Sequence, residues 1–247
     1  MKAIATGLCL SALVMAVHAA DRTWDGGGSD ANWKTPANWD GDATYPSAGD
    51  ALFFGGAAGL NNTNDLDAGT SIAGLTFSSG AGAFLLSGNA VTLGGDLVNN
   101  DADTQTVALP LILDGPRTVN AASGALVLTD GVSGSGGLTK TGPKTLTLAG
   151  ANTYEGETVV NAGGRLLITH GQALGSPSAG TTIATGTGIE IHGGLAVAEP
   201  ITLVNQNSGS MNFMSGSNLY SGLITITGGQ ARISNQEIGR ASCRERV

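Results

Sequence analysis

The stretch LVLTDGVSGSGGLTKTGPKTLTLAGANTYEGETVVNAGGRLLI, residues 126–168, contains three apolar pairs at regular intervals. In each pair two apolar residues stand two positions apart, so both side chains of an extended strand point to one face. One similar pair precedes this stretch and another follows it, at nearly the same interval. The five pairs are Val107/Leu109, Leu126/Leu128, Leu146/Leu148, Leu166/Ile168 and Ile189/Ile191.

A period of about 20 residues with one strand in each period is typical of a solenoid, whose stacked coils bury a continuous row of apolar side chains. A β-sandwich also contains many short strands, but it has no reason to keep a constant spacing. We therefore predict an all-β fold with a β-solenoid over residues 71–237. About eight coils, stacked about 4.8 Å apart, would form a rod about 40 Å long.

Residues 20–70 differ in composition and contain all three tryptophans. A solenoid needs a cap over its exposed hydrophobic end and open strand edge, so we predict an N-terminal cap plugged by Trp24, Trp33 and Trp39. The alternative is a glycan contact, in which these rings and Tyr45 stack on sugar faces while nearby aspartates bind hydroxyl groups.

Both ends of the chain are expected to lie outside the fold. Residues 1–19 combine Lys2, an apolar stretch and the small-residue site Val17-His18-Ala19, which is typical of a secretory signal peptide. Residues 238–247, IGRASCRERV, resemble translated sequencing-adapter DNA, so we expect the natural sequence to continue past Gln236. A genuine basic tail is the alternative.

Without these ends the chain is acidic and has no cysteine. Residues 20–237 carry seven Lys or Arg and eighteen Asp or Glu, a net charge of −11. Nucleic acid requires a cationic footprint, so it is not expected as a partner. Cys9 falls in the signal segment and Cys243 in the tail, which leaves no disulfide, thiolate nucleophile or cysteine metal site.

Carboxylates offer two candidate sites. Glycan-cleaving enzymes of this shape gather acids from adjacent coils on one sheet. Asp96, Asp114 and Asp130 follow one another by less than one coil, which misses the period, so turn formation is the preferred interpretation. Glu155 and Glu157 would share a face if their segment is extended and could bind Ca²⁺, but a solvated strand edge is preferred.

Histidines offer a third candidate, because His170 and His192 are separated by slightly more than one coil. If Ile168 aligns with Ile191, the two histidines point to opposite faces, so a shared metal is not expected unless a bulge intervenes. We predict no catalytic residue, no cofactor and no metal site.

Residues 132–176 contain one repeat unit whose motif is specific enough to compare with a known family. The segments GGLTKTG (136–142), LTLAGANTY (146–154) and GETVVNAGGRL (156–166) resemble the autotransporter-associated β-strand repeat, also called the passenger-associated transport repeat. The family pattern is roughly GGLxKxGxGTLxLxGxNxYxGxTxVxxGxL. The sequence departs from it at Pro143-Lys144, Glu155 and Glu157, and none of these positions is apolar in the pattern.

The resemblance implies a right-handed parallel β-helix in the passenger region of a Gram-negative autotransporter or a related surface protein. The repeat is thought to assist secretion or folding and is not itself catalytic. We therefore predict a scaffold displayed outside the cell or at the outer-membrane surface, which meets the outer-membrane translocation machinery during export. The alternatives are an adhesin or polysaccharide-binding module that contacts a surface polysaccharide or a host or neighbour cell surface, and an accessory part of a carbohydrate-active enzyme.

Overall fold

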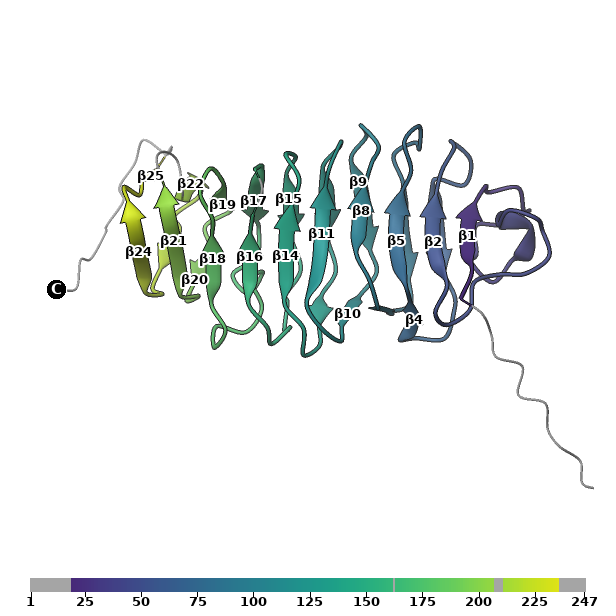
Figure 1. The fold of residues 1–247 in the computed structure, drawn as a ribbon, viewed down its shortest axis with the longest axis horizontal. Coiled ribbons are helices and arrows are strands. Elements are labelled where there is room, and N and C mark those ends of the chain that lie inside the picture. Colours follow the sequence, from purple (N-terminus) through teal and green to yellow (C-terminus); the bar gives the residue numbers. More distant parts are fainter. Residues whose placement is uncertain (1–18, 162, 207–210, 236–247) are drawn as a thin grey trace, which may run out of the picture.

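The computed structural model describes residues 19–161, 163–206 and 211–235. In this part of the chain, short strands stack side by side along a rod, with β1 (Asp21–Trp24) near one end and β24 (Ile224–Gly229) near the other (Figure 1). The strands pair in parallel, because each coil brings the chain back to the same side of the rod. The predicted all-β solenoid of about eight coils is confirmed.

Two long sheets and two short ones run along the rod. Sheet A consists, in spatial order, of β1, β2 (Ala51–Phe54), β5 (Gly74–Phe77), β8 (Leu97–Asn99), β11 (Arg117–Ala121), β14 (Leu138–Thr141), β16 (Thr158–Val160), β18 (Thr181–Ile183), β21 (Ile201–Gln206) and β24. Sheet B consists of β3 (Asn61–Asn64), β6 (Leu85–Gly88), β9 (Gln105–Ala108), β12 (Leu126–Leu128), β15 (Leu146–Leu148), β17 (Arg165–Ile168), β19 (Gly188–His192), β22 (Met211–Ser215) and β25 (Ile233–Asn235).

The third side of the rod is less regular. Its early coils form sheet C and its late coils form sheet D, while the chain between β15 and β16 and between β17 and β18 crosses this side without a strand. Sheet C consists of β4 (Thr70–Ile72), β7 (Val91–Leu93), β10 (Leu111–Leu113) and β13 (Val132–Ser133), and sheet D of β20 (Ala196–Val197) and β23 (Leu219–Tyr220).

The apolar rows that predicted the fold are in register. Leu126 aligns with Leu146, Leu146 with Leu166, and Leu166 with Ile189, and all four side chains are fully buried. Residues between the members of each pair point outward and are partly exposed, as the two-residue period of a strand requires. The core is therefore a continuous column of aliphatic side chains between the sheets.

The first predicted pair, Val107/Leu109, does not align with the pair of the next coil. Val107 aligns with Leu128, and Gln105 takes the core position opposite Leu126, so Leu109 lies beyond the strand. Gln105 is fully buried because its amide accepts a hydrogen bond from one backbone N–H of the preceding coil and donates one to a carbonyl there, at 2.8 and 3.1 Å. A search for apolar pairs passes over a polar residue whose hydrogen bonds are satisfied in the core.

The regular coils begin earlier than the composition indicated. β2, β3 and β4 already pair with the strands of the next coil, and the expected boundary between residues 70 and 71 falls within β4. β3 reads Asn-Asn-Thr-Asn and shows no apolar alternation, although Asn62 and Asn64 point inward and are buried. Ahead of β2 lie β1 and a short 3₁₀ turn, η1 (Pro36–Asn38), at the end of the rod (Figure 1).

The expected signal peptide and tail cannot be compared with the fold. Residues 1–18 and 236–247, including Cys9 and Cys243, lie outside the described residues. Within the described ranges, no helix has the length and apolar character needed to cross a membrane.

Candidate functional site

The aromatic residues predicted to cap the solenoid form one cluster at its first coil. Trp24, Trp33 and Trp39 are 0–1% exposed. Trp39 meets Trp24 and Trp33 edge to face, with ring centroids 5.3 and 6.0 Å apart, and all three rings contact Phe54 of β2. These are the edge-to-face separations that aromatic pairs favour. The cluster closes the apolar column of the solenoid.

Each indole N–H also has an internal partner. Trp24 donates to the Ala58 carbonyl at 3.2 Å, Trp33 to the Asn62 side chain at 2.8 Å, and Trp39 to the Trp33 carbonyl at 2.8 Å. Because these three rings are buried, a sugar has no access to their faces in this structure, and the alternative of a glycan contact is not supported for them. Tyr45, the fourth residue of that prediction, is 44% exposed and leaves its ring open to solvent.

The cap is fastened to the solenoid by a buried carboxylate. Asp50, which is fully buried, accepts hydrogen bonds from the amides of Ala20 and Ser47 and pairs with the Arg22 guanidinium at 3.0 Å. Burial acts to raise the pKa of Asp50, but the hydrogen bonds from Ser47, Ala20 and Arg22 outweigh it and hold the pKa below its ordinary value. The carboxylate therefore stays charged and ties β1 to the first coil.

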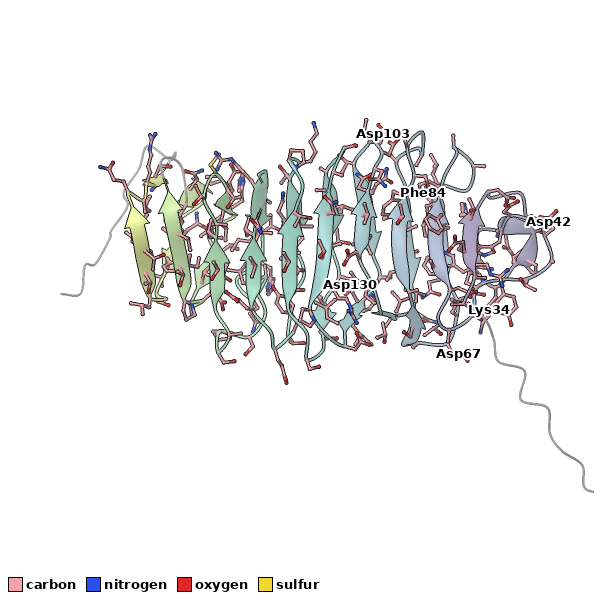
Figure 2. The ribbon with its side chains drawn as sticks, in the orientation of Figure 1. Lys34, Asp42, Asp67, Phe84, Asp103 and Asp130 are labelled. Carbon is pink, nitrogen blue, oxygen red and sulfur yellow. The ribbon has the colours of Figure 1, made fainter. Side chains whose placement is uncertain are left out.

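The three aspartates considered as a catalytic set are engaged separately. Asp96 accepts a hydrogen bond from the Thr118 amide at 3.1 Å, Asp114 pairs with Arg117, and Asp130 accepts one from the amide of the next residue at 2.7 Å. Figure 2 shows Asp130 in the middle coils, away from the acids labelled at the cap end. Asp114 and Asp130, each followed by glycine, shape their own turns, whereas Asp96 bonds to the next coil.

Glu155 and Glu157 do not lie on an extended segment, since the chain bends at Gly156. Both side chains are exposed, and Glu157 accepts a hydrogen bond from the Thr182 hydroxyl of the next coil. The condition under which the two acids would share a face is therefore not met.

His170 and His192 occupy different environments. Ile168 does align with Ile191; His170 follows β17 and accepts a hydrogen bond from the Gln172 amide at 3.1 Å, whereas His192 lies on β19 with its Nε2 3.8 Å from a Glu190 oxygen. Within the described residues, no three His, Cys, Asp or Glu side chains gather closely enough to hold a metal ion.

A different set of residues joins the coils where the third strand is missing. Asn152, 3% exposed, accepts a hydrogen bond from the Val132 amide of the preceding coil at 2.8 Å and donates one to the Ala173 carbonyl of the following coil. This side chain adds to the backbone hydrogen bonds between these coils, such as those from the amides of Thr153 and Glu155 to the carbonyls of Val132 and Gly134, at 2.8 and 2.9 Å.

Tyr154 and Gly156 complete this connection. The Tyr154 ring is fully buried, and its hydroxyl contacts that of Thr158, which donates to the Leu174 carbonyl at 3.1 Å. Burial raises the pKa of Tyr154, so the phenol stays neutral. A Cβ at Gly156 would lie 2.5 Å from the amide nitrogen of Gly137, so only glycine lets the two coils approach. We call Asn152, Tyr154 and Gly156 the coil clamp.

Lys140 is the unexpected member of this region. It stands at an inward position of β14 and is fully buried, and its Nζ donates to the carbonyls of Gly142 and, at 3.1 Å, Gly163. Gly164 follows with φ +66°, and a Cβ there would lie 2.4 Å from the ammonium nitrogen. Burial lowers the pKa of Lys140 to about 8. The ammonium group thus secures the turn carbonyls of two neighbouring coils.

Comparison with known proteins agrees with this geometry. Residues 138–168, which span Lys140 and the coil clamp, match the passenger-associated-transport-repeat model, as do residues 203–230. The chain is also 31% identical over 252 residues, 95% of its length, to the adhesin BmaC autotransporter of Brucella suis biovar 1 (strain 1330). The chain carries two passenger-associated transport repeats. This repeat protein spans 6% of the length of that relative, and no match to a solved structure was found.

The second repeat was not recognised in the sequence, although its clamp residues recur. The Asn218 side chain accepts a hydrogen bond from the Leu195 amide at 2.8 Å, and the Tyr220 hydroxyl donates to the Glu199 carbonyl. A Cβ at Gly222 would lie 2.0 Å from that same carbonyl oxygen. The spacing Asn-x-Tyr-x-Gly, rather than the aliphatic pattern, is the signal that identifies both repeats.

Glu199, whose backbone carbonyl accepts a hydrogen bond from the Tyr220 hydroxyl, carries a buried carboxyl group. Its side chain is 4% exposed, and one carboxyl oxygen accepts a hydrogen bond from the Thr181 hydroxyl at 3.1 Å. Burial raises its pKa to about 7, and the Thr181 hydrogen bond offsets this only in part. The carboxyl group is therefore partly protonated near neutral pH.

Proposed function

We propose that this chain is a non-catalytic passenger segment, whose repeats support secretion, folding and display of a protein on the surface of a Gram-negative bacterium. The observation that carries the proposal is the coil clamp, present in both repeats. In each clamp the asparagine side chain accepts a hydrogen bond from a backbone amide of the preceding coil. A finished coil therefore acts as a template for the next one.

Coil-on-coil growth suits a chain that emerges gradually from a secretion pore. In a solenoid each coil contacts only its neighbours, so folding starts at one place and propagates. The buried aromatic cluster at the N-terminal end gives such growth a closed starting surface, and the first clamp joins coils that lack a third strand. Stability comes from the core and hydrogen bonds, without a disulfide in the described coils.

The separate engagement of the candidate acids supports a non-catalytic role. General acid and base catalysis needs two groups within reach of one bond. Asp96, Asp114 and Asp130 are instead bonded to their own local turns or neighbours. A scaffold needs only the turns that these residues form.

The proposal is tested by measuring how much of each clamp variant is displayed on the cell surface. We expect Asn152→Ala to reduce the amount of the protein that external protease removes from intact producing cells, because the next coils lose their template. Asn120→Ala, on the outer face of sheet A, is the matched control. Equal display of both variants, or a wild-type protein that external protease cannot reach, would contradict the proposal.

Adhesion is the second candidate function, because the similar Brucella protein is named as an adhesin. Its partner would be a surface polysaccharide or the surface of a host or neighbouring cell. The measurement is binding of the labelled chain to such cells, with the heat-unfolded chain as control. Equal retention of the folded and unfolded chains would count against adhesion.

A further inference from the structure

A column of threonines runs along the outer face of sheet A. The register of β11, β14, β16, β18, β21 and β24 places one outward residue of each strand next to the corresponding residue of its neighbours. Five of these six residues are threonine and the sixth is valine. We call the column the threonine ladder; its members are Thr118, Thr139, Val159, Thr182, Thr202 and Thr225.

The ladder hydroxyls are available to a ligand. Within the described chain, the hydroxyls of Thr118, Thr139, Thr202 and Thr225 have no hydrogen-bond partner in the protein, while Thr182 donates to Glu157, which directly precedes β16. Each hydroxyl can both donate and accept, and the β-branched side chain restricts its rotamers. The rungs repeat about every 4.8 Å.

The ladder also differs from its surroundings in charge. No member of the ladder is charged, although residues 20–237 carry a net charge of −11. The carboxylates that meet it are Glu157, at the Thr182 hydroxyl, and Asp96, at the Thr118 amide. The corresponding outward row of sheet B is mixed, since it includes Thr147, Leu167 and Glu190. An acidic protein repels anionic polymers. Removing water from uncharged hydroxyls costs less free energy than removing it from charged groups, provided that a neutral partner replaces the lost hydrogen bonds.

The ladder is too small a surface to bind a second copy of the chain stably. Six rungs by about 10 Å give a face on the order of 300 Å² per copy, well below the roughly 800 Å² that each partner of a stable complex buries. A long polymer does not face this limit, because many weak contacts along one chain add up in avidity.

We propose that the threonine ladder binds a neutral, unbranched, extended polysaccharide that lies along the rod, with about one sugar on each coil. Sugar hydroxyls both donate and accept, which matches the threonine hydroxyls, and the threonine and valine methyl groups contact the sugar ring. This inference rests on the adhesion candidate above and gives it a ligand class and a face. It moves the contact from the N-terminal cap to the sheet.

Linear neutral β-glucan oligomers of increasing length are the probes, and calorimetry or affinity electrophoresis of the full chain is the measurement. Affinity should increase with length until an oligomer spans the ladder, about six sugars at one per rung. The double variant Thr139→Val/Thr202→Val keeps the β-branched shape and should bind about 25-fold more weakly, roughly fivefold for each hydroxyl lost. Thr147→Val on sheet B is the matched control and should bind as the wild type does.

Three results would overturn the ladder. They are unchanged binding by the double variant, equal binding of an anionic polygalacturonate, and a threonine-dependent dimer in sedimentation without glucan binding. If the chain adheres to cells and the double variant adheres equally well, the ladder fails while adhesion stands. If the folded chain adheres to no cell surface yet binds glucan through the ladder, adhesion fails and the ladder stands.

Discussion

Replacing Lys140 by methionine tests the buried ammonium group of the first repeat through the pH dependence of stability. Methionine is of similar length and apolar, so it fills the inward position of β14 without a charge. In the wild type, burial lowers the pKa of Lys140 from 10.5 to about 8. Between these two values the unfolded chain binds more protons than the folded chain, so the stability of the folded chain increases with pH.

The size of this effect follows from the two pKa values. One pKa unit corresponds to about 1.4 kcal/mol, so the full shift is worth about 3 kcal/mol, of which about 2.5 kcal/mol appears between pH 7 and 10. The gain is complete above pH 10.5 and is lost as the pH falls through 8. Other shifted groups act mostly outside this window: Glu199 chiefly between 4.5 and 7, Asp50 below 4, and Tyr154 above 10.

The assay is urea unfolding at half-unit steps from pH 7 to 10, followed by circular dichroism. The wild type should gain about 2.5 kcal/mol over this range, Lys140→Met should show little gain, and the exposed Lys144→Met should follow the wild type. Only the slope with pH is compared, because the absolute stability of Lys140→Met also contains the loss of hydrogen bonds to Gly142 and Gly163.

A flat wild-type curve, or an equal slope in Lys140→Met, would refute the reasoning. A carbon-13 titration of the lysine side chains gives an independent check that does not require the variant to fold. One lysine should titrate near pH 8 in the folded protein and return to 10.5 in urea.

Three further changes are predicted. Trp39→Ala should destabilise the chain by about 3–5 kcal/mol in urea unfolding because it empties the aromatic cluster, whereas Tyr45→Ala, at an exposed ring, should cost less than about 1 kcal/mol. In the wild type, the raised pKa of Glu199 should lower the free energy of unfolding by at most about 3 kcal/mol as the pH rises from 4.5 to 7, because the folded carboxyl group binds more protons there than the unfolded one. Glu199→Gln should abolish this decrease, and an unchanged decrease in the variant would exclude Glu199 as the cause. Gly164→Ala should lower the melting temperature more than Gly186→Ala, since both glycines have positive φ but a Cβ meets close atoms only at Gly164; equal losses would show that backbone strain alone decides the cost.

The sequence predicted the solenoid because its apolar pairs repeat at the length of one coil. The pairs at Leu126, Leu146, Leu166 and Ile189 align as expected. The prediction was wrong where a polar side chain takes a core position, as Gln105 does, because hydrophobic periodicity does not register a buried amide whose hydrogen bonds are satisfied. The same cause hid β3, whose inward residues are asparagines.

The aromatic cluster shows a second kind of limit. Three tryptophans near a terminus are consistent with a plug and with a sugar-binding surface, and composition cannot distinguish them because the same rings serve both purposes. The tertiary structure decides for the plug, since Trp24, Trp33 and Trp39 are packed on one another and on Phe54. Tyr45, equally aromatic, lies at the surface.

By itself, the sequence determined the fold class, the acidic character, the first repeat and the turns, because these depend on local spacing and on residue type. The tertiary structure alone decided which residues of distant coils meet. It brought Asn152 against Val132 and Ala173, buried Lys140 between two turns, and aligned the threonine ladder on one sheet. The physical reason is the register between coils: the coils differ in length, and a shift of one position would turn every outward side chain into the core.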